Sequence, residues 1–202
     1  GAFVDIEGGL LGSVGGPVEI SITDQVEATT SGGGSLSEVV EIHAGGDVQT
    51  SGAGLVVANT LLLNPSYTSS LGGPFPGGVS NAVFDLATSV DRVGIGSNLA
   101  STTIDNSLVT TAVTVGLGAS YDATLPGLVF NGGAGTENVA FTAGGDLQLL
   151  TDGNPVNVNN LQLTAAGNLS NDGSTLDVDA AGSIVLDAAG INNSGVDLFA
   201  SG

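Results

Sequence analysis

The segment LDVDAAGSIVLDAAGINNSG, from Leu176 to Gly195, contains the same short motif twice: an alternating apolar and polar run followed by Ala-Ala-Gly. Apolar residues at every second position, such as Leu176 and Val178, are typical of a β-strand with one buried face. Glycine beside a small residue allows a left-handed or sharply bent backbone. We therefore expect two successive strands of a coil, with bends at Gly182 and at Gly190.

The same order of residue types recurs elsewhere: apolar, polar, apolar, any residue, Ala, small, Gly. The further copies are VEIHAGGDV from Val40, VAFTAGGDL from Val139, LQLTAAGNL from Leu161 and VDLFASG from Val196. The last four copies, with the one at Leu176, begin 22, 15 and 20 residues apart, as expected of solenoid rungs with variable loops. No stretch has helical spacing of apolar residues over more than two turns. The pattern predicts an all-β solenoid, as one domain over residues 1–202.

The middle of the chain is less regular. Residues 64–81, NPSYTSSLGGPFPGGVSN, combine Gly with three Pro residues, which a central strand does not tolerate. We expect a protruding loop or an insertion there. Because the first hundred residues repeat poorly, an antiparallel β-sandwich of pilin type is the alternative fold.

The charge balance excludes several partners. Twenty acidic residues face one basic residue, Arg92, for a net charge of −19. Phosphate binding needs clusters of Lys and Arg, so we expect no nucleic-acid partner, and an anionic membrane surface is disfavoured for the same reason.

The apolar runs are too short to insert into a membrane, and no Cys is present. The first residues lack an initiator Met and a basic segment, so we expect a processed or excised piece.

The phrases Ala-Gly-Gly-Asp, Ala-Ala-Gly-Asn and Asn-Asn-Ser-Gly resemble the repeats of filamentous-haemagglutinin-like adhesins and related large bacterial surface proteins. The resemblance covers Val139 to Gly202 and extends to Val40 to Asn59. It implies a right-handed parallel β-helix, secreted by a two-partner or autotransporter route to the bacterial cell surface. It also implies a structural or adhesive segment of such a protein, or a small relative with the same rungs, and no particular receptor. A host or matrix surface is among the expected partners, and the residues themselves lead us to expect no enzyme.

The repeat pattern runs to Gly202 without a polar cap. Natural solenoids blunt their exposed strand edges with an atypical repeat. The expected partners are therefore adjoining β-helix repeats or other copies of the chain. Copies stacked head to tail would form an extracellular filament, because such contacts do not close.

An enzyme that acts on polysaccharides is the alternative function, as a lyase or a hydrolase. Such chemistry needs a base, or opposed carboxylates with basic residues that hold an acidic sugar. His43 and Arg92 are the only candidates. We interpret His43 as a permissive surface position and Arg92 as the partner of a nearby carboxylate, so no catalytic residue is predicted.

Calcium is the one cofactor that the sequence suggests. Asp177, Asp179, Asp187 and Asp197 are expected to point outward on successive coils about 4.8 Å apart, where a cation bound through oxygen would relieve their repulsion. A solvated acidic face is the simpler interpretation. The segment GGAGTENVAF from Gly132 approximates a calcium-binding nonapeptide, with Glu137 where Asp is expected.

Overall fold

The computed structural model describes residues 3–8, 19–28, 38–44, 46–63, 66–67, 83–95, 101–117, 119–121, 128–130, 138–150, 156–171, 176–192 and 196–200. All regular secondary structure in these ranges is β-strand, so the all-β prediction is confirmed. Across the same ranges, no helix has the length and apolar character needed to cross a membrane.

The chain contains these strands: β1 (Phe3–Gly8), β2 (Ile20–Ile22), β3 (Gln25–Glu27), β4 (Val39–Ala44), β5 (Val48–Thr50), β6 (Leu55–Leu63), β7 (Ser66–Tyr67), β8 (Val83–Ile95), β9 (Ser101–Asn106), β10 (Val113–Leu117), β11 (Ala119–Tyr121), β12 (Leu128–Phe130), β13 (Asn138–Ala143), β14 (Leu147–Leu150), β15 (Val156–Val158), β16 (Asn160–Asn171), β17 (Leu176–Ala180), β18 (Ile184–Ile191) and β19 (Val196–Ala200).

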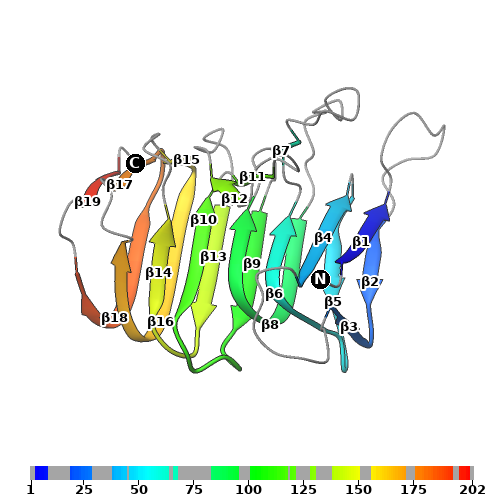
Figure 1. The fold of residues 1–202 in the computed structure, drawn as a ribbon. Coiled ribbons are helices and arrows are strands. Elements are labelled where there is room, and N and C mark those ends of the chain that lie inside the picture. The colour runs from blue at the N-terminus through cyan, green and yellow to red at the C-terminus, as the bar shows by residue number, and fades with distance from the viewer. Residues whose placement is uncertain are drawn as a thin grey trace.

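The strands pair in parallel ladders. The first ladder joins β1, β4, the second half of β6, the second half of β8, β10, β14 and the ends of β16 and β18. The second ladder joins β2, β5, the first half of β8, β9, β13 and the first parts of β16 and β18. The third joins β15, β17 and β19. In Figure 1 the strands advance across the molecule roughly in sequence order, from blue β1 and β2 at one end to red β19 at the other.

Three strands, β8, β16 and β18, belong to both main ladders. The pairing of β8 with β9 closes a ring of six parallel strands, β8, β10, β14, β16, β13 and β9. In β8 the buried positions are even-numbered up to Val90 and odd-numbered from Val93. Because side chains alternate between the two faces of a strand, this change means that β8 bends at Asp91 and Arg92.

Register shows which repeats are equivalent. Val139 lies opposite Leu161, 22 residues further on, and Leu176 lies opposite Val196. Leu161, however, pairs with Ile184 in the second ladder, whereas Leu176 belongs to the third. The alignment of all five phrases as equivalent rungs is therefore wrong: the phrase encodes one strand and the bend after it, and it recurs on different ladders.

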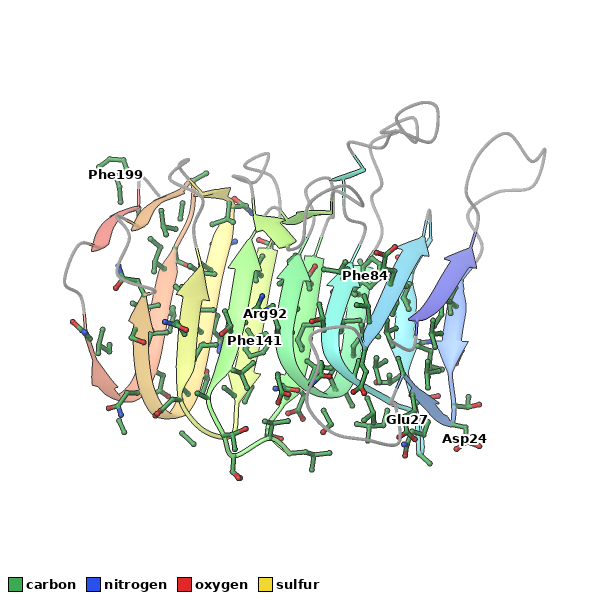
Figure 2. All side chains as sticks on the ribbon, in the orientation of Figure 1. Asp24, Glu27, Phe84, Arg92, Phe141 and Phe199 are labelled. Atoms are coloured by element: carbon green, nitrogen blue, oxygen red, sulfur yellow. The ribbon has the colours of Figure 1, made fainter. Side chains whose placement is uncertain are left out.

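The core lies between the ladders and follows the period of two. Phe84 and Phe141 are its largest members, 0% and 1% exposed, and they lie between the layers of strands in Figure 2. Their neighbours are the inward Leu, Ile and Val side chains of successive strands. Truncation of such a buried Phe to Ala costs about 3–5 kcal/mol, so these columns supply much of the stability.

The bends after the repeats differ in form. Residues 181–183 make the bend predicted at Gly182, whereas Gly190 lies inside β18, where the register with β16 is irregular. Of the two conformations expected for these glycines, left-handed or sharply bent, the left-handed one is not used here: among the described glycines only Gly52 has positive φ, at 63°. The reason for these glycines is close approach: a Cβ on Gly182 would collide with Asn160 Oδ1, and one on Gly190 would lie 2.6 Å from Asn168 Oδ1.

At the bend of β8, the side-chain amide of Asn106 makes hydrogen bonds that a neighbouring strand makes elsewhere. Asn106 is wholly buried, and its Oδ1 accepts hydrogen bonds from the Val90 backbone N–H at 3.0 Å and from Thr88 Oγ1 at 2.8 Å. Its Nδ2 donates to the Val90 carbonyl at 3.0 Å. Strand β9 pairs with β8 as far as Ala87, and β10 pairs with it from Arg92. The Asn106 amide thus satisfies the β8 backbone between those two partners.

Parallel pairing throughout the main sheet contradicts the alternative of an antiparallel β-sandwich. The one antiparallel pair among the described strands is β11 with β12. The predicted loop at residues 64–81 lies outside the described residues, apart from β7, which pairs in parallel with β11.

Two buried threonines provide a matched test of these hydrogen bonds. Thr88 and Thr102 are both 0% exposed, but Thr88 Oγ1 donates to Asn106 and Thr102 Oγ1 has no hydrogen-bond partner. We expect Thr102→Val to raise the free energy of unfolding by about 1 kcal/mol, and Thr88→Val to lower it by about 1 kcal/mol. Denaturant unfolding of both variants measures the difference, and equal effects would contradict the hydrogen-bond assignment.

Candidate functional site

The four candidate calcium ligands fall on two sheets. Asp177 and Asp197 lie opposite each other on β17 and β19, and Asp179 lies opposite Phe199. Asp187 lies in the second ladder, opposite Thr164, and is exposed. The expected single row of all four is therefore not formed. The side chains of the three third-ladder aspartates are outside the described residues, so calcium binding there stays a prediction.

No other metal centre is evident in the described part of the chain. Within it, no three His, Cys, Asp or Glu side chains gather closely enough to hold a metal ion. The nonapeptide-like segment at Gly132 and Glu137 lies outside the described residues.

His43 and Arg92 are far apart. Both belong to the first ladder, in which Arg92 is aligned with Thr60 and, through it, with Val39. Arg92 is thus two strands away from His43 and four residues back along the strand direction. At about 3.3 Å per residue and about 4.8 Å between strands, the two backbones are roughly 16 Å apart. The side chain of His43 is not described, but this separation gives no support for a shared catalytic site.

The position of Arg92 on its strand is defined, whereas its pairing with a nearby carboxylate stays a prediction. Arg92 is half-buried on β8, between Thr60 and Thr114, and lies near the middle of the molecule in Figure 2. Its neighbour Asp91 is exposed and accepts a hydrogen bond from Asn59 Nδ2 at 3.0 Å.

A cluster of amide side chains lies where strands β13, β16 and β18 of the second ladder begin. Asn138 Oδ1 accepts hydrogen bonds from Asn159 Nδ2 at 2.9 Å and from Asn160 Nδ2 at 2.6 Å. Asn160 Oδ1 in turn accepts from the backbone N–H and the Oγ of Ser183, at 2.9 and 3.0 Å. Asn138 and Asn160 are opposite each other in the register of β13 and β16, so the bond between them joins equivalent positions. The cluster connects β13, the start of β16 and the residue before β18 through the amide side chains of Asn138, Asn159 and Asn160.

The cluster borders a shallow hollow of about 270 Å³ on the outer face of the second ladder. Its lining is uncharged: Ser101, Asn138, Val139, Ala140, Asn160, Leu161, Gln162, Ser183 and Val185. Hydroxyl and amide groups can donate and accept hydrogen bonds, but none of them is a general acid or base at neutral pH. Among the described residues that line it, the hollow therefore presents hydrogen-bonding groups but no general acid or base.

Side chains at the bends cap the strand that follows in the ladder. Asp47 Oδ1 accepts from the Val83 backbone N–H at 2.9 Å, and Asp146 Oδ1 accepts from the Asn168 N–H at 2.7 Å. Asp47 and Asp146 are the polar residues that follow Ala-Gly-Gly in two of the sequence copies. That polar position thus has a structural role, which the pattern alone does not reveal: it bonds a backbone donor across the ladder where strand pairing is interrupted.

Asn160 caps the backbone N–H of Ser183 in the same way, and its removal tests the contribution of such a cap to stability. We expect Asn160→Ala to lower the free energy of unfolding by about 1–3 kcal/mol, because the Ser183 N–H loses its acceptor at the bend. Gln162→Ala is the control on the same strand, where an exposed side chain should cost no more than about 0.5 kcal/mol. Thermal or denaturant melts measure both, and a control that is as destabilising as Asn160→Ala would refute the capping role.

Similarity to known proteins does not supply a function for this chain. Comparison with protein-family models, with curated proteins and with solved structures gave no match.

Proposed function

We propose that this chain is a structural or adhesive segment of a secreted bacterial surface protein, built as a right-handed parallel β-helix that lengthens by end-to-end stacking. The observation that carries the proposal is parallel pairing of successive strands in all three ladders. The offset between paired residues varies from 18 to 37 residues along the chain, and in the later coils it is 22 residues in each of the three ladders. Val139 with Leu161, Leu147 with Leu169, and Val156 with Val178 each share this offset. A constant offset in separate ladders is what a solenoid coil produces.

The closed ring of six strands is compatible with a β-helix. Strands β8 and β16 each run through a bend from the second ladder into the first, so strand assignment joins the two faces into one ring. After β16 the chain enters the third ladder at β17 and returns to the second at β18. One circuit of three faces then corresponds to one coil.

The distribution of the core favours a rod that can be extended. Middle strands bury their inward residues fully, whereas the partly buried hydrophobic residues are concentrated at the two ends of the described ladders. They are Val4, Ile6, Ile20, Val26, Ile184, Leu186 and Ala188, with Val109 as the exception in the middle. Apolar side chains and open strand edges at both ends favour contact with further coils.

The acidic exterior sets the conditions for such contact. A net charge of −19 opposes the approach of two copies, and screening shortens this repulsion from about 30 Å at 0.01 M salt to about 8 Å at 0.15 M. Secretion and adhesion come from the resemblance of the Ala-Gly-Gly-Asp phrases to surface adhesins. A polysaccharide-acting enzyme remains the second candidate, because parallel β-helices also include such enzymes, but the backbone positions of His43 and Arg92 give it no support.

Electron microscopy at physiological salt tests the proposal directly. The wild-type chain is expected to form uniform filaments, and Leu186→Lys is expected to abolish them, because the Lys would place a charge inside the stacked core. Gln162→Lys is the matched control, with the same charge on the outer face one strand away. Thermal melts confirm that both variants are folded. Filaments of Leu186→Lys equal to wild type, or no wild-type filaments at any salt concentration, would contradict the proposal.

A further inference from the structure

We propose that copies of this chain join in one fixed register, in which β2 of one copy pairs in parallel with the open edge of β18 of the next. The inference rests on the proposed function. It adds the two strands that meet and the residues that lie side by side.

The β18 edge is incomplete on one side. Strand β18 pairs with β16, and no other described strand lies on its far side in the main sheet. Its inward residues Ile184, Leu186 and Ala188 are only partly buried, whereas their partners in β16 are 1% to 5% exposed. Ile191, opposite buried Leu169, is 49% exposed. A further parallel strand would bury this row and satisfy the free backbone groups.

The opposite end offers a strand of the same kind. Strand β2 pairs with β5 and with no other described strand. It reads Ile20-Ser21-Ile22, with exposed Ser21 between two inward apolar residues. This is the pattern that Ile184, Val185 and Leu186 present on β18. Asp24 and Glu27 lie at this end in Figure 2, and Phe199 lies at the other.

The internal ladder fixes the register. One inward column runs through every strand of the second ladder: Ile20, Val48, Phe84, Thr102, Val139, Leu161 and Ile184. The neighbouring outward column runs through Ser21, Gln49, Asp85, Thr103, Ala140, Gln162 and Val185. A copy that continues the ladder therefore places its Ile20 beside Ile184 and its Ser21 beside Val185.

A second copy is the occupant that this geometry specifies. Strand direction, inward face and the apolar pattern of β2 all agree with those of the strands already stacked on one another inside the chain, so the contact repeats an interface that the fold forms six times in the second ladder. Two different ends meet, which makes the contact heterologous, and repetition of it produces an open filament.

Cysteine cross-linking tests the register, since the chain has no native Cys. Ser21→Cys and Val185→Cys are single exposed substitutions on separate copies. Neighbouring strands lie about 4.8 Å apart, within the Cα separation that a disulfide spans. Mixed under a mild oxidant at physiological salt, the two variants should give a disulfide-linked dimer as the major product. Ala189→Cys mixed with Ser21→Cys is the control: it is exposed on the same strand but four residues from the predicted contact.

Sedimentation of the same samples separates the two proposals. Polymers with the Ser21 to Val185 cross-link support both. Polymers that lack this cross-link, or that cross-link equally well through Ala189, would overturn the register and leave the structural function in place. Folded chains that remain monomeric at all salt concentrations would overturn the structural function and this interface with it.

Discussion

The parallel backbone ladder is the interaction on which the rest of the structure depends. A parallel strand inside a sheet has hydrogen-bond partners on both sides, and the chain provides them by returning to the same direction after 18 to 37 residues. Where the ladder bends, strand pairing fails and backbone groups lose their partners. Asn106, Asp146 and Asn160 restore those bonds with side-chain oxygens. The polar residues at the bends are therefore part of the ladder, and their uncharged or acidic character is compatible with a chain that has almost no basic residues.

The strands were predictable from the sequence because alternation is a local signal. Leu161 and Leu163 on β16 are buried as their period indicates, and the bend at residues 181–183 lies where Ala-Ala-Gly predicts it. Ladder membership was not predictable, because the same phrase serves strands on different faces. Leu176 resembles Leu161 in its surroundings along the chain, yet only register, which depends on intervening loop lengths, assigns the two to different ladders.

The candidate site was predicted less well for a related reason. Asp187 was grouped with Asp177 and Asp197 on the assumption of one repeated face, and the structure separates it from them. The amide cluster of Asn138, Asn159 and Asn160 was partly visible as an Asn pair, but its partner Asn138 is 21 and 22 residues away and joins it only through register. The partial burial of hydrophobic residues in the first and last described strands has no sequence signal, since Ile20 and Ile184 follow the same alternation as the buried inward residues.

In the proposed assembly, stability and end-to-end stacking have one origin. Within the chain, neighbouring strands cover one another's inward residues, and a further copy would cover those of the first and last described strands in the same way. X-ray fibre diffraction from aligned filaments tests this central claim most directly. Strands that stack along the filament as they do within the chain should give a reflection at about 4.8 Å on the meridian, parallel to the fibre axis. Filaments with that spacing on the equator, or with no such reflection, would contradict the account.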